Sequence, residues 1–496
     1  MEEPVRVASE FNQIAFFAFA GYITLVVALG IYAARFSSTG VSNYFIGGRK
    51  MGMFVVAVSA VVSGRSAWLL LGFTGMSFAM GLSAIWAVLG YTIVEFFLFF
   101  FYAPRIRRFT GKNDCITLPD FFAARFDDKR GVLRIATVSI ILIFMVAYVA
   151  AQFVAGGKAF SASFMIAENQ GIIITAAIIL FYTIIGGFLA VSLTDTIQGI
   201  IMVFALLILP LVAISHLGGF QVFFSEASKI NDGGFFNPFA LGFGTLVGFL
   251  GIGLGSPGNP HIIARYMSIE KHGSLHKVAY VGTATNFLLA LGALLTGMVG
   301  RIYFPDVALL PAADAENVYP ALAQQHLHPI LFGVVISSIF AAIMSTADSQ
   351  LLVAASAIAR DIYEKMINQQ SQISQRKLII ISRAIVFLLV LVALFLAMAA
   401  GQVVFWLVLF AWAGLGAAFG PTSILAIFWK RTNLPGMIAG IITGAITVLV
   451  WNRVAVLKSA IYELVPAFIF ALLATIIVSL LTKPSQVSEQ RFEDFE

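Results

Sequence analysis

The chain has 496 residues, of which 60% are hydrophobic and 11% are charged, whereas a soluble protein carries about 25% charged residues. Long apolar runs between short polar segments therefore predict a polytopic helical membrane protein of the all-α class. The single cysteine excludes an intrachain disulfide framework, and the net charge of +6 indicates basic loops at one membrane face, not binding to nucleic acid.

The apolar runs predict thirteen membrane-spanning helices, since about 20 consecutive apolar residues cross the hydrocarbon core as one helix. Two boundaries are weakly marked in the sequence, at Ala190–Ser192 and near Gly401. The predicted spans are 12–34, 53–80, 82–103, 132–161, 171–190, 192–215, 239–268, 275–301, 328–365, 378–400, 403–429, 435–452 and 459–482.

The distribution of basic residues predicts the orientation, because cytoplasmic loops carry an excess of Lys and Arg. With the N-terminus outside, 23 of the 30 Lys and Arg residues lie in inner segments, 6 lie in outer segments, and Arg65 lies within the membrane. The sequence therefore predicts an inner-membrane protein with its C-terminus in the cytoplasm.

The second predicted span is interrupted by the polar sequence Ser63-Gly64-Arg65-Ser66. Such a break at membrane depth is tolerated only where it lines a cavity or is buried in protein. An arginine at the centre of a spanning helix costs roughly 2.5–3.5 kcal/mol on insertion scales. We therefore expect Arg65 to have a partner and a function.

The seventh predicted span contains a second interruption, GLGSPGNP at 253–260, where prolines remove helical hydrogen bonds. Its G-x-G-x-x-G spacing lacks the preceding strand and following acidic residue of a nucleotide site. It is either a kinked packing helix or, as the matching break at 63–66 favours, a break lining a substrate path. Two five-helix units, each with one broken helix, form an inverted repeat typical of secondary transporters.

These features predict one transmembrane domain, and no motif of an enzyme active site is present. A sensor would normally carry a signalling domain, for which the tail after Lys483 is too short. A channel is less consistent with a closed midplane site between broken helices. The predicted parts are an extra N-terminal helix (12–34), two repeats (53–215 and 239–429), two C-terminal helices (435–482) and a cytoplasmic tail (483–496).

Polar side chains cluster in the ninth predicted span as Ser345, Thr346, Asp348 and Ser349. Hydroxyls in a helix can bond the carbonyls of their own preceding turn, but an intramembrane carboxylate indicates function. Carboxylate, hydroxyl and freed carbonyl oxygens suit a hard cation, so we expect an ion site here. Asp195 is either a residue near a helix start or part of an ion pathway.

Three other polar groups receive structural interpretations. Glu95 and Glu463 lack clustered polar neighbours in the sequence and are read as buried structural or interfacial groups. His261 follows Pro260 and is read as a contact at a helix start.

The chain resembles the sodium:solute symporter family, and within it the bacterial sodium/proline symporters. The resemblance implies a LeuT-like five-plus-five inverted repeat that moves a small solute, proline or another amino-acid-like molecule, by alternating access. Na⁺ is the coupling ion that it implies, and no other cofactor is expected. The likeness is carried by YFIGGRKMG (44–52), ITLPDFFAARFDDK (116–129), GGFLAVSLTDTIQ (186–198), GNPHIIARYM (258–267), AAIMSTADSQLLVAASAIARDIY (341–363) and AWAGLGAAFGP (411–421).

The resemblance also implies binding residues, which join the first broken helix to the ninth span and to the second broken helix. The sodium site it implies consists of Val62, Arg65, Ala342, Ser345 and Thr346. A second ion site in some members maps to Asp195, Asp348 and Ser349. The substrate region maps to Ser63, Ser66, Trp68, Gly72, Ile252, Ser256 and Pro260.

Two departures from the sodium/proline symporters affect the expected site. Those symporters have an aspartate and an apolar residue where this chain has Gly64-Arg65, and aromatic residues where it has Ile252 and Ser256. The second change predicts a wider, less aromatic pocket.

Arg65 allows two interpretations, and we expect Asp195 or Asp348 to neutralise it. If its guanidinium points toward Ser345 and Thr346, it replaces sodium and transport is sodium-independent or proton-coupled. If it points into the substrate cavity, it binds a substrate carboxylate and the protein is an ordinary sodium symporter.

Overall fold

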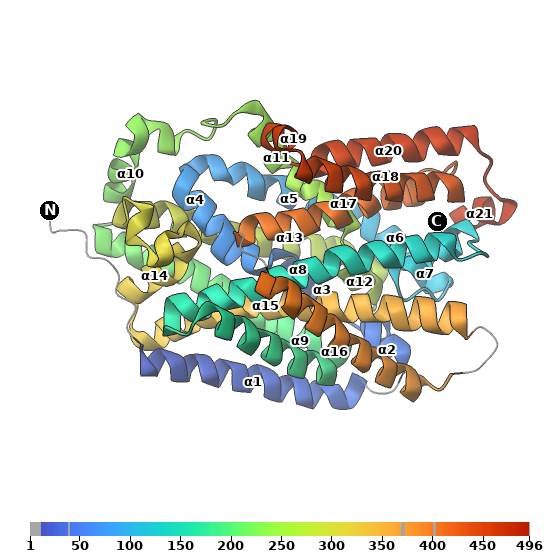
Figure 1. The fold of residues 1–496 in the computed structure, drawn as a ribbon, viewed down its shortest axis with the longest axis horizontal. Helices are drawn as coiled ribbons and strands as arrows, with labels where there is room; N and C mark the ends of the chain where they lie inside the picture. Colours follow the sequence, from blue (N-terminus) through green and yellow to red (C-terminus); the bar gives the residue numbers. More distant parts are fainter. Residues whose placement is uncertain (1–10, 38–39, 369–372, 400–402, 496) are drawn as a thin grey trace.

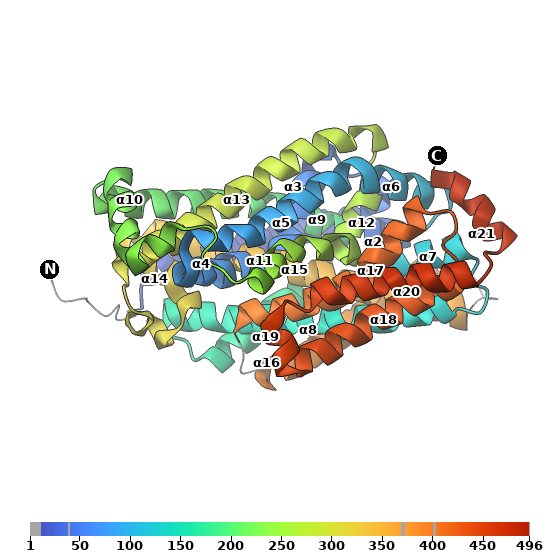
Figure 2. The same ribbon diagram turned by 90° about the horizontal axis from the view of Figure 1, so that it is seen from above.

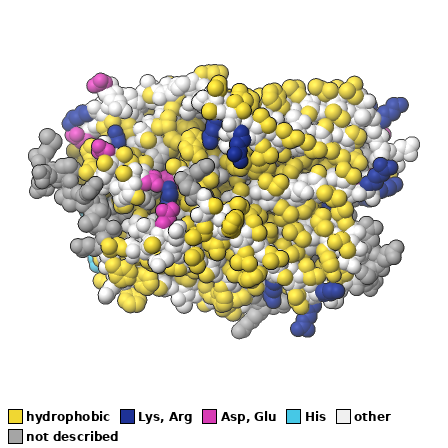
Figure 3. Space-filling model, in the orientation of Figure 1, with side chains coloured by type: hydrophobic (Ala, Val, Ile, Leu, Met, Phe, Trp, Pro, Cys, Tyr) yellow, Lys and Arg dark blue, Asp and Glu magenta, His cyan; other side chains and the backbone are white. Residues whose placement is uncertain are grey.

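The computed structural model describes residues 11–37, 40–368, 373–399 and 403–495, and within these ranges every regular element is helical. The long helices run roughly parallel to the long axis of the molecule (Figures 1 and 2). Hydrophobic side chains cover most of the visible surface between the two ends, and many charged side chains gather toward the ends (Figure 3). This arrangement is that of a multi-pass membrane protein.

The α-helices are α1 (Gln13–Ser37), α2 (Val41–Ile46), α3 (Met53–Ala67), α4 (Thr74–Met80), α5 (Ile85–Phe97), α6 (Ala103–Lys112), α7 (Leu118–Phe126), α8 (Val132–Phe164), α9 (Glu168–Leu217), α10 (Phe220–Lys229), α11 (Phe243–Gly251), α12 (Pro260–Ser268), α13 (Leu275–Tyr303), α14 (Val318–His326), α15 (Pro329–Ser356), α16 (Gln375–Ala399), α17 (Val404–Phe428), α18 (Leu434–Arg453), α19 (Ala455–Ala460), α20 (Leu464–Leu481) and α21 (Gln486–Arg491). Three shorter helical segments matter for the site and the tail: η2 (Trp68–Phe73), η6 (Ile252–Gly258) and η12 (Phe492–Phe495).

Ten helical segments among the described residues are long and apolar enough to cross a bilayer, so the predicted count of thirteen is not reproduced by this criterion. Two of the ten, Met53–Lys112 and Glu168–Leu217, each contain two predicted spans. The predicted span 239–268 is instead divided between the shorter helices α11 and α12. The predicted boundary near Gly401 lies outside the described residues.

Three residues with positive φ turn the two longest segments. A straight helix of 60 residues would be about 90 Å long, whereas the hydrocarbon core is about 30 Å thick. Within Met53–Lys112 the chain bends at Ser66 (φ 49°) and at Gly81 (φ 62°). Within Glu168–Leu217 it bends at Gly187 (φ 65°), close to the weakly marked boundary at 190–192.

The helices pack as two groups, which meet at the interrupted helices and also where α13 packs on α9. In the first group, α3 and α5 each pack against α13, η6 packs against α5, and α12 packs against α3. In the second group, α8, α9, α15 and α16 pack together, and α17 packs on α8. The helix α3 contacts α15, and η6 contacts α17, so both interrupted helices lie at the boundary between the groups.

The C-terminal segment folds back onto the end of the molecule where α6 and α7 lie (Figures 1 and 2). Phe495 is 1% exposed and stacks on Phe109 with ring centroids 4.6 Å apart. The buried Arg125 donates hydrogen bonds to the Ser488 hydroxyl at 2.8 Å and to the Ala426 carbonyl at 3.2 Å. The tail thus links α7 to the end of α17.

Candidate functional site

The first interruption lies at Ser66, whose left-handed φ of 49° is uncommon outside glycine. Side chains satisfy the backbone amides that the break releases. The Ser66 hydroxyl accepts from the Trp68 N–H at 3.1 Å, and the Gln152 side chain accepts from the Ala67 N–H at 3.1 Å. The predicted discontinuity of this helix is therefore confirmed.

Arg65 points into the first helix group and forms an ion pair with Glu95 of α5. Its Nε donates to Asn286 Oδ1 at 2.9 Å, and Asn286 Nδ2 donates to Glu95 Oε2 at 2.7 Å. Ser256 Oγ donates to Glu95 Oε1 at 2.9 Å. These four buried side chains come from α3, α5, α13 and η6, so one polar network connects both interrupted helices.

This network corrects two predictions. Asp195 and Asp348 do not neutralise Arg65, because Glu95 does. Glu95 is buried as expected, but it is surrounded by polar partners that are distant in the sequence. The sequence contained one available signal, since Glu95 is a carboxylate inside an apolar run, just as Arg65 is a cation inside one.

A small cavity of about 10 Å³ lies beside Arg65 at the boundary between the helix groups. The guanidinium carbon of Arg65 is 3.7 Å from the ring centroid of Tyr91. Trp412 Nε1 donates to the Ile252 carbonyl at 2.8 Å. The cavity is lined by Gly64, Arg65, Trp68, Tyr91, Tyr148, Ile252, Val408, Leu409 and Trp412.

Aromatic side chains from α5, α8 and α17 line the small cavity beside Ile252, and the prediction of a pocket wider than that of the sodium/proline symporters stays a prediction. Ser256 bonds Glu95, and Ile252 lies between the small cavity and a larger pocket.

The predicted substrate residues are brought together only in part. Trp68 and Ile252 line the cavity, and Ser66 lies next to it through a 3.4 Å hydrogen bond from Tyr148. Gly72 instead packs against Phe405 of α17. Pro260 begins α12 and borders a separate small cavity.

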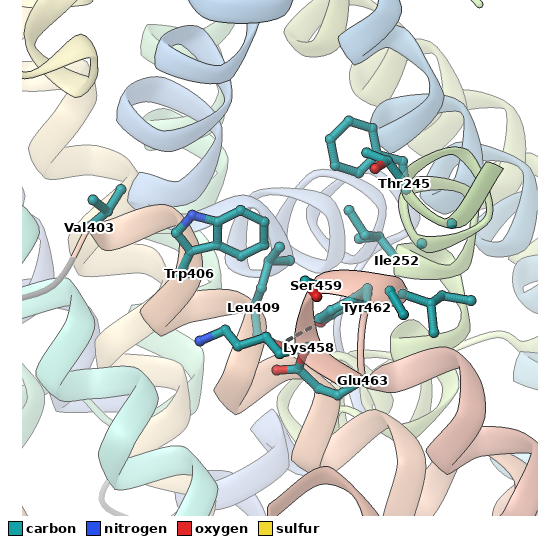
Figure 4. A pocket seen from close by; sticks show the side chains of 14 residues that line it. Thr245, Ile252, Val403, Trp406, Leu409, Lys458, Ser459, Tyr462 and Glu463 are labelled. Atoms are coloured by element: carbon teal, nitrogen blue, oxygen red, sulfur yellow. Dashed lines mark hydrogen bonds between the residues drawn. The ribbon is translucent and has the colours of Figure 1, made fainter. Parts of the chain in front are cut away.

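A larger pocket of about 580 Å³ adjoins the central cavity, and the two share Ile252 and Leu409. Figure 4 shows Trp406 and Ile252 at two sides of this pocket, with Lys458 and Glu463 along one edge. The side chains of Ile252 and Leu409 thus separate a surface pocket from the buried cavity.

The predicted sodium ligands lie where α3 meets α15. Thr346 Oγ1 donates to the Ser63 carbonyl at 2.9 Å, which connects the first break to α15. Ser345 Oγ donates to the Ala342 carbonyl at 3.2 Å. Val62 is also fully buried here. This set of carbonyl and hydroxyl oxygens fits an alkali cation, and the Arg65 guanidinium is directed to Glu95 and Asn286.

The cluster predicted as a second ion site contains an arginine, Arg265, that was not among its predicted residues. Arg265 of α12 is 1% exposed, donates to Asp195 Oδ2 at 3.0 Å, and also bonds Ser349 Oγ. Ser59 donates to the same Asp195 oxygen at 2.5 Å. Asp348 accepts from Ser349 at 3.1 Å.

Each aspartate of this cluster keeps one oxygen, Asp195 Oδ1 and Asp348 Oδ2, without a hydrogen-bond partner among the described residues. The structure thus brings Asp195, Asp348 and Ser349 together, with Arg265 as an additional member. The sequence offered one indication that Arg265 is buried, since it follows the apolar residues Ile262–Ala264 within the same predicted span.

The model of the sodium:solute symporter family matches residues 44–444. The osmoregulated proline transporter of Bacillus subtilis is 38% identical over 480 residues, covering 95% of this chain and 96% of that protein. The sodium/proline symporter of Escherichia coli is 38% identical over 481 residues, covering 96% and 95%.

Solved structures show the same fold. A Na⁺-coupled sialic acid symporter, in a substrate-bound outward-open state, superposes with a TM-score of 0.82 at 20% identity and covers 96% of this chain and 100% of that one. A nucleobase-cation-symport-1 transporter, in a closed conformation with bromovinylhydantoin bound, gives a TM-score of 0.57 at 12% identity, covering 92% and 99%. The LeuT-like all-helical fold with two interrupted helices is therefore confirmed, and the chain belongs to the sodium:solute symporter family.

Proposed function

We propose that this protein is a sodium-coupled symporter of a small, amino-acid-like solute, with proline as the first candidate. One observation carries the sodium coupling: Thr346 Oγ1 lies 2.9 Å from the Ser63 carbonyl oxygen of the first helix break, and the neighbouring Ser345 hydroxyl bonds the Ala342 carbonyl of α15. The two proline transporters with 38% identity support the solute class.

The alternative, in which Arg65 replaces the sodium ion, has less support. Its guanidinium is held by Glu95 and Asn286 within the first helix group. The hydroxyls of Ser345 and Thr346 bond carbonyl oxygens instead. A cation at those oxygens would therefore come from solution.

The second cluster is proposed as an accessory ion site. Asp195, Asp348 and Ser349 provide oxygen atoms, two of them unpartnered among the described residues. Arg265 already supplies one positive charge there, so an added cation would compete with its hydrogen bonds.

We propose that the protein lies in the inner membrane with its N-terminus outside and its C-terminus in the cytoplasm. The uneven distribution of Lys and Arg supports this orientation. The repeats at 53–215 and 239–429 each contain one interrupted helix, which supports their inverted relationship.

The test is uptake of radiolabelled L-proline into proteoliposomes that contain the purified full-length protein. We expect uptake to follow an inward sodium gradient, and to lose that dependence in Ser345→Ala. Equal uptake when potassium replaces sodium at constant ionic strength would contradict sodium coupling. Sodium-driven uptake of a different solute, with none of proline, would contradict only the solute.

A further inference from the structure

We propose that Arg65 is the carboxylate receptor of the transport site, so that the solute carries a carboxylate, and that Glu95 is a positioning residue for this arginine. The inference rests on the proposed transport function and adds the chemical class of the solute.

The first step is the orientation of the guanidinium. One edge of Arg65 is held by Glu95 and by Asn286, which accepts from Nε at 2.9 Å. The terminal nitrogen Nη2, which pairs with Glu95, has no further hydrogen-bond partner among the described residues. Because Arg65 also lines the central cavity, the guanidinium keeps donor capacity toward that side. Planar, fixed donors of this kind favour carboxylate recognition.

The second step is the donor character of the cavity wall. Trp68 Nε1 and Tyr91 Oη are both buried, and neither has a hydrogen-bond partner among the described residues. Both residues line the cavity with Arg65. A buried donor without a partner is destabilising, and an indole N–H can only donate. An incoming oxygen anion would satisfy these groups.

The third step is the role of Glu95. Its oxygens accept from Ser256 at 2.9 Å and Asn286 at 2.7 Å, and it pairs with Arg65. Both oxygens of the Glu95 carboxylate therefore already have partners. It neutralises Arg65 when no solute is present and prevents the arginine from turning away from the cavity.

The cavity of about 10 Å³ has space for a water-sized molecule, so solute entry requires it to widen. Ile252 and Leu409 separate it from the larger pocket. A solute could enter from that pocket by passing between these two side chains. The part of the solute that enters first would then contact Trp68 and Arg65.

The test measures ligand-induced thermal stabilisation and affinity of the purified full-length protein in sodium buffer. The matched probes are L-proline, L-prolinamide and pyrrolidine, with lactate as a carboxylate without an amine and galactose as an uncharged solute. We expect carboxylate probes to bind, and prolinamide and pyrrolidine to bind about tenfold more weakly or worse.

The decisive variant is Arg65→Met, with Arg301→Met as the control for loss of an arginine outside the cavity. We expect Arg65→Met to lose the response to carboxylate probes and to keep the response to sodium alone. Should Arg65→Met fail to fold, the double variant Arg65→Met/Glu95→Met removes the buried pair together, and Tyr91→Phe tests the cavity wall separately. Unchanged carboxylate affinity in the folded arginine variant overturns the proposal.

The outcomes separate this inference from the proposed function. Sodium-dependent binding of galactose or prolinamide, with no preference for carboxylates, overturns the receptor role of Arg65 and leaves sodium symport intact. Carboxylate binding that needs Arg65 but is the same without sodium supports the receptor and contradicts sodium coupling.

Discussion

Arg265 of α12 and Asp195 of α9 form a hydrogen-bonded ion pair of 3.0 Å, and their side chains are 1% and 0% exposed. Removal of one partner would leave a buried charge without its counter-ion, which costs about 3–5 kcal/mol. We therefore expect Arg265→Met and Asp195→Leu each to lower the thermal unfolding temperature strongly. The double variant should be more stable than the sum of the two losses predicts.

Differential scanning fluorimetry in detergent measures this coupling. The exposed pair Lys229–Glu226, with side chains 66% and 39% exposed, is the control, and its disruption should cost at most about 1 kcal/mol. Strictly additive losses in the Arg265 and Asp195 variants would mean that the two residues act independently.

Thr346→Val should weaken sodium binding, because it removes the hydroxyl that reaches the Ser63 carbonyl and keeps the shape of the side chain. We expect the sodium concentration for half-maximal thermal stabilisation to rise about five- to tenfold, and Thr346→Ser to restore it. Ser356→Ala is the control, since that hydroxyl bonds its own helix at Val353. An identical sodium titration for Thr346→Val would exclude this hydroxyl as a ligand.

The helix breaks and the polar cluster of α15 were predictable because they are local interruptions of apolar runs. The partner of Arg65 was not, since it depends on which helices are neighbours and how each is rotated. A helix such as α15, apolar and buried on nearly every side, shows no amphipathic stripe from which its orientation can be read.

The same reason explains Arg265 and the aromatic cavity wall. Arg265 lies near the end of the predicted span 239–268, and only the packing of α12 brings it to Asp195. Tyr91, Tyr148 and Trp412 come from three different helices, and only packing brings them to the break at Ser66.

Membrane orientation can be tested with new cysteines, because the native thiol is unsuitable. Cys115 is 2% exposed, and burial raises its pKa well above the usual thiol range, so it should resist maleimide even in permeabilised cells. In a Cys115→Ala background, we expect Lys229→Cys to react with an impermeant maleimide in intact cells.

Lys129→Cys should react only after permeabilisation, since Lys129 lies in the segment expected to be cytoplasmic. Both native side chains are well exposed, at 66% for Lys229 and 80% for Lys129. The opposite labelling order would reverse the orientation of the whole protein.

Acidification should destabilise the protein through His326, whose pKa is lowered to about 4 by burial and by the neighbouring His216. The unfolded chain, with an ordinary histidine pKa of about 6.5, binds a proton in this range that the folded protein does not. The free energy of unfolding is therefore unaffected by protonation of His326 above about pH 6.5, and it falls as the pH is lowered from 6.5 toward 4.

We expect His326→Gln to flatten the decrease in unfolding temperature between pH 7 and pH 5. The exposed His276 is the control, and His276→Gln should leave the pH profile unchanged. A wild-type profile retained in His326→Gln would assign the pH dependence to other groups.

The C-terminal segment should contribute to stability because Phe495 is buried against Phe109 and Phe121. Phe495→Ala should cost about 3–5 kcal/mol, the usual range for a buried phenylalanine. Phe220→Ala, at a side chain that is 46% exposed, is the control. Equal unfolding temperatures for Phe495→Ala and the wild type would mean that the tail is detached in solution.

The network of Arg65, Glu95, Asn286 and Ser256 has a mechanical consequence. It fastens α3, α5, α13 and η6 to one another through buried hydrogen bonds, so these segments should move as one rigid body. Between the two helix groups, by contrast, the Arg265–Asp195 pair joins α12 to α9, and the hydrogen bond from Thr346 to the Ser63 carbonyl joins α15 to α3. A sodium ion bound at those oxygens would then act as a removable pin between two bodies that tilt against each other.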